Sequence, residues 1–102
     1  IPVAMLSLTE ENYLKAIYHL SEGGAKSVLT NELAEAMNTK AASVTDMIKK
    51  LSAKEVITYE KYYGVNVTHK GKTEALLVIR KHRLWETFLV EKLGFAWDEV
   101  HE

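Results

Sequence analysis

The spacing of the apolar residues changes twice along this chain of 102 residues. Up to Leu51 they recur every three to four positions, which is the period of an amphipathic helix. Between Val56 and Thr68, β-branched and aromatic residues follow the period of two that strands have. From His69 the helical spacing returns. These changes predict a mainly α-helical fold with a small β-hairpin inserted before the last long helix.

Three short helices are expected before the hairpin. Ser7 can cap the first, because a glutamate three positions later completes a capping box, and Gly23-Gly24 ends that helix. Thr30 is expected to cap the second helix with its hydroxyl group. The third begins near Lys40. Their inner faces are predicted from apolar residues at helical spacing, which are Tyr13, Leu14, Ile17, Tyr18, Leu20, Leu33, Ala34, Met37, Val44, Met47, Ile48 and Leu51.

A hairpin and a long helix follow. The hairpin is expected over residues 56–68, with its turn at residues 61–64, where a glycine suits a tight connection. The long helix runs from residue 69 to residue 93, and Gly94 closes it. Its apolar stripe is broader than the first 70 residues need, so a second subunit is one way to cover it. Another acidic helix is expected to begin near Trp97, and the sequence ends within it.

The formal net charge of −1 is an average of unlike segments. Residues 38–83 hold ten lysines and arginines against four acidic residues, whereas residues 1–37 and 84–102 are acidic. Positive charge gathered in one segment is typical of a surface that meets a polyanion. The phosphates of a nucleic acid are the obvious candidate.

Composition and motifs disfavour several classes of protein. The chain has no cysteine, which removes disulfides, thiolate zinc sites and a cysteine nucleophile. Its apolar runs are far shorter than the ~20 residues of a membrane span, and residues 1–8 lack the pattern of a secretory signal. The sequence has no nucleophile with a base at useful spacing, no phosphate-binding glycine loop and no HExxH motif. We therefore expect a cytoplasmic protein that has no membrane partner and is not an enzyme.

Two short helices joined by a tight turn and followed by a hairpin predict a winged helix-turn-helix domain over residues 1–72. The second helix of such a motif enters the major groove of double-stranded DNA. Asp46 is open to two interpretations, since it can accept from a cytosine amino group or pair locally with Lys49 or Lys50. The residues expected at base edges are Lys40, Ala41, Ala42, Ser43 and Asp46, and those expected near phosphates are Lys49, Lys50 and Lys61.

Five stretches make the chain recognisable. They are Leu-Thr-Glu-Glu-Asn-Tyr-Leu-Lys-Ala-Ile-Tyr at residues 8–18, Ser-Val-Thr-Asp-Met at 43–47, Tyr-Glu-Lys-Tyr-Tyr-Gly at 59–64, Arg-Lys-His-Arg-Leu at 80–84 and Val-His-Glu at 100–102. With them, nearly the whole chain resembles the iron- and manganese-dependent repressors named after the diphtheria toxin repressor. The resemblance implies a homodimer that binds a palindromic operator when loaded with Fe(II) or Mn(II) and represses metal-uptake genes. It also implies that residues 73–102 are the start of a helical dimerisation and metal-binding domain, here cut short.

His82 and Glu86 are the first candidates for metal ligands, because residues four apart face the same side of a helix. His101 lies on the next predicted helix, which an antiparallel return could bring close. Imidazole and carboxylate together suit Fe(II), Mn(II) or Zn(II) better than Ca(II). The spacing alone is equally typical of an exposed pair. The resemblance implies that His82, Glu86 and His101 form an ancillary metal site.

The first helix departs from the family pattern at two positions. Asn12 stands where iron regulators usually have methionine and manganese regulators aspartate, and its amide oxygen is a weaker ligand than a carboxylate. Lys15 stands where manganese-type members have a carboxylate, and its charge would oppose a two-metal cluster. The resemblance places the remaining effector ligands beyond Glu102. A bound metal would bridge the first helix to the dimerisation helices and so set the spacing of the two recognition helices at ~34 Å.

Two other interpretations remain open. A winged-helix regulator could bind DNA without metal, with His82 and His101 in structural roles, and its binding would then ignore a chelator. Alternatively, a winged helix can bind a protein through the apolar helix after its hairpin. Binding would in that case lack a steep dependence on salt.

Overall fold

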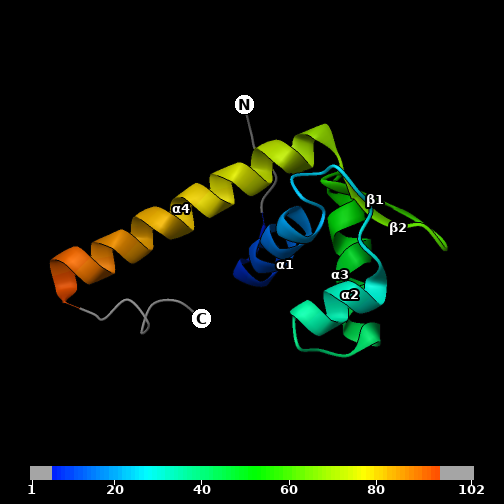
Figure 1. Ribbon diagram of the computed structural model, residues 1–102, viewed down its shortest axis with the longest axis horizontal. Helices are drawn as coiled ribbons and strands as arrows, with labels where there is room; N and C mark the ends of the chain where they lie inside the picture. Colours follow the sequence, from blue (N-terminus) through cyan, green and yellow to red (C-terminus); the bar gives the residue numbers. More distant parts are fainter. Residues whose placement is uncertain (1–5, 95–102) are drawn as a thin grey trace.

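The computed structural model describes residues 6–94, which fold as three helices, a two-stranded hairpin and a long helix. Figure 1 shows the first helices and the hairpin gathered at one end of the last helix, which extends away from them as a rod. The predicted mainly α-helical fold with one hairpin is confirmed. The elements are α1 (Leu8–Leu20), α2 (Thr30–Ala36), α3 (Ala41–Ala53), β1 (Ile57–Glu60), β2 (Gly64–Val67) and α4 (His69–Leu93).

The starts of α1 and α2 use different caps. At α1 the backbone N–H of Glu10 donates to Ser7 Oγ at 3.1 Å, and the N–H of Ser7 donates to the Glu10 carboxylate at 2.8 Å. This capping box was predicted. The prediction that Thr30 caps α2 is wrong, because Thr30 is the first helical residue and Leu29 is the N-cap. The Leu29 N–H donates to the carboxylate of Glu32 at 2.8 Å, so an acid inside the first turn satisfies this amide without a capping hydroxyl.

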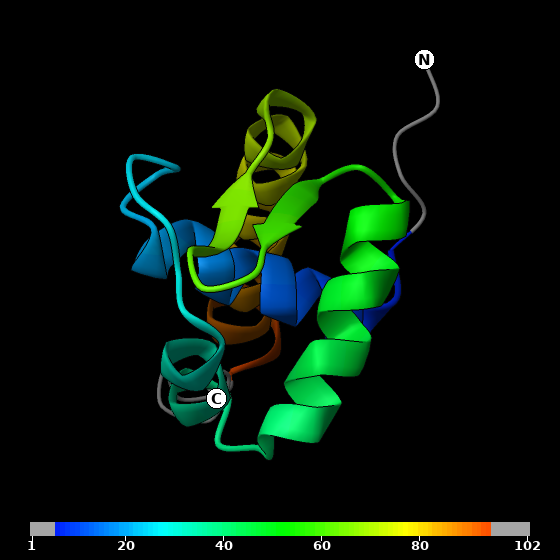
Figure 2. The same cartoon turned by 90° about the vertical axis from the view of Figure 1, so that its right-hand side faces the viewer.

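The hairpin is antiparallel, with Ile57 opposite Val67 and Glu60 opposite Gly64. Figure 2 shows it in front of α4, beside α3. Val28, from the segment before α2, forms a bridge to Val65 through two backbone hydrogen bonds of 2.8 Å. A Cβ atom at Gly64 would lie 2.4 Å from the Val28 carbonyl oxygen. Glycine is therefore needed at this position for the chain to approach so closely.

The second strand begins and ends one residue earlier than expected, because its last predicted residue has another role. Thr68 is the N-cap of α4, and its hydroxyl accepts from the Gly71 N–H at 2.9 Å. The same hydroxyl donates to the Glu55 carbonyl at 2.8 Å. This threonine thus fixes the direction in which α4 leaves the hairpin.

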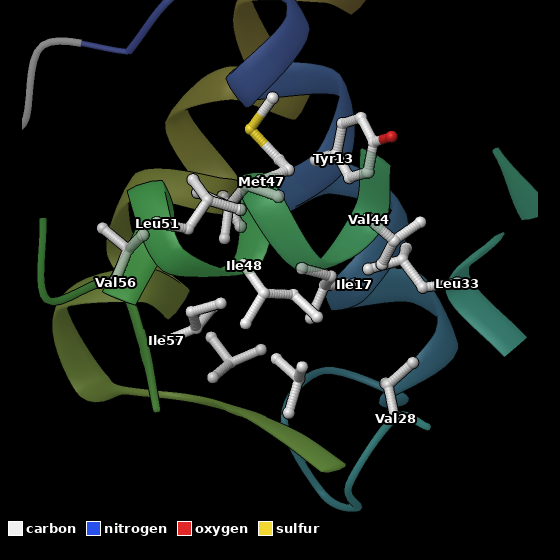
Figure 3. Packing of buried hydrophobic residues seen from close by; sticks show 14 residues of the cluster. Tyr13, Ile17, Val28, Leu33, Val44, Met47, Ile48, Leu51, Val56 and Ile57 are labelled. Atoms are coloured by element: carbon white, nitrogen blue, oxygen red, sulfur yellow. The ribbon is translucent and has the colours of Figure 1, made fainter. Parts of the chain in front are cut away.

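A single apolar cluster joins α1, α3 and the hairpin. Leu14, Ile17 and Leu51 have no exposed surface, and Figure 3 shows the neighbouring side chains of α1 and α3 directed at one another above the hairpin. Fully burying one such side chain contributes about 2 kcal/mol. The predicted inner faces of the three helices are confirmed at their centres, while Tyr18, Leu20, Ala34 and Met37 are only partly buried at the margin.

Only the first part of α4 joins this core. Ala75 and Val78 are buried, and Gly71 lies so close to β1 that a Cβ atom would be 1.8 Å from the Val56 carbonyl oxygen. Farther along the helix, large apolar side chains are exposed on one stripe, namely Leu77, Leu84, Trp85 and Phe88. Over residues 6–94 no helix is long and apolar enough to cross a membrane.

Candidate nucleic-acid interface and metal centre

The outer face of α3 is a continuous exposed surface. Val44, Met47, Ile48 and Leu51 face the core, which fixes the rotation of the helix. The turn between α2 and α3 places the start of α3 next to α2. In this turn Asn38 has a left-handed conformation with φ at 52°, and Lys40 is the N-cap of α3. Seven of the predicted DNA-binding residues are exposed on or next to this helix: Lys40, Ala41, Ala42, Ser43, Asp46, Lys49 and Lys50. The structure therefore places them together on one accessible face.

The hairpin tip carries the eighth predicted residue, Lys61, which is also exposed. Its Nζ lies 5.3 Å from the centre of the Tyr62 ring. Tyr62 and Tyr63 are 84% and 68% exposed, so the tip presents aromatic rings together with a charge. The sequence pattern alone assigns these two tyrosines no role, although they directly follow Lys61. A hollow connects this wing to the starts of α2 and α3, and its lining includes Leu29, Thr30, Asn31, Ala41, Tyr59, Tyr62 and Gly64.

The position of α3 relative to α1 is fixed by a buried carboxylate. Glu10 is 6% exposed and accepts from Lys54 Nζ, just after α3, at 2.6 Å. This hydrogen bond from Lys54 lowers the pKa of the Glu10 carboxyl below its ordinary value, and the backbone hydrogen bond from Ser7 adds to the effect. The helix α3 is thus held at its far end by a charged contact as well as by the core.

His82 lies where α4 crosses α1, and both of its ring nitrogens have contacts there. Nε2 is 3.4 Å from Oε1 of Glu11, and Nδ1 is 3.4 Å from Nζ of Lys15. Lys81 Nζ contacts the other oxygen of Glu11 at 2.5 Å. We call Glu11, Lys15, Lys81 and His82 the His82 cluster. It joins residues about 70 positions apart in the sequence.

Three of the four predicted metal ligands lie in the described part of the chain. His82 and Glu86 share one side of α4, and both are partly buried. Asn12 is exposed on α1 and lines a hollow with Lys15, Ala16, His19, Ala36 and Met37. His101 lies outside the described residues. Within residues 6–94 no three histidine, cysteine or acidic side chains form a group that could hold a metal ion.

Glu11 is the residue near His82 that sequence reasoning missed. Its side chain is 12% exposed, and its carboxylate lies close to His82 although the two residues are 71 positions apart in the sequence. One signal could have found it, because Glu11 and Lys15 are four apart on α1 and so lie on one face. The donors around His82 suit a divalent transition metal in type. Two ammonium groups accompany them, however, and one of these contacts the imidazole directly.

Known proteins match this chain over nearly its full length. The profile of a family described as iron dependent repressor, N-terminal DNA binding domain, matches residues 5–65. A second profile, described as iron dependent repressor, metal binding and dimerisation domain, matches residues 68–102. The two matches follow one another in the order in which the structure places the winged helix and α4.

Individual relatives agree with these matches. An uncharacterized HTH-type transcriptional regulator of Methanocaldococcus jannaschii is 39% identical over 87% of this chain and 71% of its own length. The diphtheria toxin repressor of Corynebacterium jeikeium is 33% identical over 92% of this chain but only 39% of its own length. The solved structure of the manganese regulator SloR superposes with a TM-score of 0.76 at 39% identity, covering 90% of this chain and 42% of that one. The chain thus belongs to the family of iron-dependent repressors and has its winged-helix fold.

Proposed function

We propose that the whole protein is a metal-dependent transcriptional repressor that binds a palindromic operator as a homodimer. The observation that carries this proposal is the exposed outer face of α3, which presents small and basic side chains to solvent. The family to which the chain belongs consists of transcriptional repressors, and its matching N-terminal part is a DNA-binding domain. The genes it controls are proposed to serve metal uptake.

The roles on DNA follow from the chemistry of the exposed side chains. Ser43 and Asp46 reach the base edges with Lys40, and the methyl groups of Ala41 and Ala42 contact thymine methyls. Lys49, Lys50 and Lys61 bind phosphates, which fix the position on the duplex but carry no sequence information. These separate roles at base edges and phosphates predict that affinity and sequence preference depend on different residues of the same face.

The metal is proposed to be Fe(II) or Mn(II). His82 and Glu86 of α4 would hold it with His101 at the ancillary site, and Asn12 of α1 would contribute an oxygen ligand to the effector site. When bound, the metal supplies a positive charge with directed coordination bonds between helices that otherwise meet through side-chain contacts. The manganese regulator among the structural relatives supports this choice of ion. In this proposal residues 1–72 read the DNA and residues 73–102 contribute to dimerisation and metal binding. Two recognition helices held ~34 Å apart would match successive major grooves.

The deciding experiment is a fluorescence-anisotropy titration of the full-length protein with operator DNA in the presence of Mn(II), of Fe(II) without oxygen, and of a chelator. Tight binding only with metal is expected, and His82→Ala should weaken the response to metal. His69→Ala is the matched control, because His69 is an exposed histidine at the start of the same helix. Equal binding in all three conditions would leave a DNA-binding protein without metal control.

Two further parts of the proposal concern what the protein does not do and where it acts. We propose that it is not an enzyme, since repression requires binding alone and the family members are repressors. We also propose that it acts in the cytoplasm, where a bacterial or archaeal operator lies. The alternative of a protein-binding winged helix predicts affinity with little dependence on salt, so the anisotropy titration should be repeated at several salt concentrations.

A further inference from the structure

The contacts of His82 favour one tautomer of its imidazole ring. An ammonium group can only donate hydrogen bonds, so Nδ1, which faces Lys15 Nζ at 3.4 Å, must be the accepting nitrogen. A carboxylate can only accept, so Nε2, which faces Glu11 at 3.4 Å, must carry the proton. Both contacts are satisfied together by one form of the ring, the neutral tautomer protonated on Nε2. In that form the single lone pair available to a metal is the one on Nδ1, directed at Lys15.

We propose that the Lys15 ammonium is a built-in cation that competes with a divalent metal for His82 and fastens α1 to α4 when no metal is bound. This inference rests on the proposed metal site at His82. A metal ligand must offer an unprotonated nitrogen. The metal therefore has to displace Lys15 from Nδ1, or displace the proton and Glu11 from Nε2.

The surroundings of His82 make its contacts stronger than those of an ion pair on the open surface. The side chains of His82 and Glu11 are only 17% and 12% exposed, and a pair with so little solvent around it is screened less than an exposed one. Lys81, whose side chain is 60% exposed, adds a second cation to the same carboxylate. The His82 cluster thus already balances the charge of Glu11 from within the protein. A divalent metal would enter a site that holds positive charge.

The first test concerns the metal-free, full-length protein and the ring nitrogens of His82, observed by 15N NMR. We expect Nδ1 to have the chemical shift of an unprotonated nitrogen that accepts a hydrogen bond. In Lys15→Met the shift should move toward that of a free unprotonated nitrogen. Lys26→Met is the matched control, because it removes the same charge and Lys26 pairs with Glu22 on the surface. An Nδ1 shift that ignores Lys15→Met would overturn the proposal.

The second test measures metal affinity by competition with a chromophoric chelator, with Mn(II) and Co(II) as probes. Losing the competing charged hydrogen bond should make Lys15→Met bind metal about tenfold more tightly. Lys15→Arg, which keeps the charge, should stay close to the native affinity, as should Lys26→Met. Lys15→Gln gives a second uncharged variant if Lys15→Met folds poorly. Unchanged affinity in both uncharged variants would overturn the competition even if the NMR shift moved.

These outcomes can be separated from failure of the proposed function. Operator binding that does not respond to metal would refute the metal-dependent repressor, yet both readouts on Lys15 would still be measurable, because neither involves DNA. Metal binding with no effect of Lys15 would refute the inference and leave the repressor intact.

Discussion

At the scale of single residues, the buried carboxylate of Glu10 makes stability depend on pH. The hydrogen bond from Lys54 lowers its pKa from the ordinary 4.5, so the folded protein binds fewer protons there than the unfolded chain. The contribution of Glu10 is therefore present above about pH 4.5 and is lost as the pH falls through the lower folded pKa. Glu10→Gln should lower the free energy of unfolding at pH 7 by about 1–2 kcal/mol and remove that part of the acid loss.

Urea unfolding at a series of pH values from neutral to acidic measures this effect. Glu35→Gln is the control, because Glu35 is an exposed acid on α2. Its curve of unfolding free energy against pH should run parallel to that of the native protein. If the Glu10→Gln curve also ran parallel, the carboxylate would not have the altered pKa.

The lysines of the proposed DNA face should act on the salt dependence of binding. Each phosphate contact contributes about 0.9 to the slope of log affinity against log salt concentration. Replacing Lys49, Lys50 or Lys61 singly by Gln should reduce the slope by about that amount and weaken operator and random DNA alike. Lys92→Gln, at the far end of α4, should leave the slope unchanged.

Ser43→Ala should instead reduce the preference for operator over random DNA. A change in the salt slope caused by Ser43→Ala would contradict the placement of Ser43 at a base edge.

At the scale of elements, the joint between α4 and the hairpin depends on the absence of a side chain at Gly71. Alanine is favoured over glycine within a helix by about 1 kcal/mol, so propensity alone predicts that Gly71→Ala stabilises the protein. The added Cβ atom would, however, lie 1.8 Å from the Val56 carbonyl oxygen and 2.9 Å from Val67 Cγ1. The clash should dominate and lower the free energy of unfolding by about 1–3 kcal/mol, as measured by urea denaturation. Lys70→Ala, at the exposed neighbouring position, should change little.

The elements themselves could be predicted because each depends on local patterns. The change of apolar spacing located all four helices and the hairpin, and the capping box at Ser7 is a signal within four residues. The bridge between Val28 and Val65 could not be predicted, because the two segments are nearly forty positions apart and no tight turn joins one directly to the other. Glu11 was missed for the same reason. The prediction for Thr30 failed for a local reason. The Leu29 N–H donates to the Glu32 carboxylate, and a capping hydroxyl would not reach this amide.

At the scale of the whole molecule, α4 carries an apolar stripe that the winged helix leaves exposed. Leu84 and Trp85 are 62% and 58% exposed, and the Trp85 ring stacks on Phe88 with 5.4 Å between centres. Leu77, Arg80, Lys81, Leu84 and Trp85 line a hollow on this side. Exposed apolar side chains gathered on one helix are typical of an interface, and the profile matched by this part of the chain describes a dimerisation domain.

Trp85→Lys in the full-length protein should therefore weaken dimerisation by at least about tenfold, as measured by analytical ultracentrifugation. Leu76→Lys is the control, because Leu76 is exposed on the same helix but does not line the hollow.

Loss of the dimer should also change the affinity for DNA. The core joins α1 to α3, and the His82 cluster joins α1 to α4, so a pairing of two α4 helices would determine where both α3 helices lie. A monomeric Trp85→Lys protein should bind a single half-site about as well as the native protein but lose the added affinity for a palindrome. If the variant stayed dimeric, the two copies would have to meet through another surface.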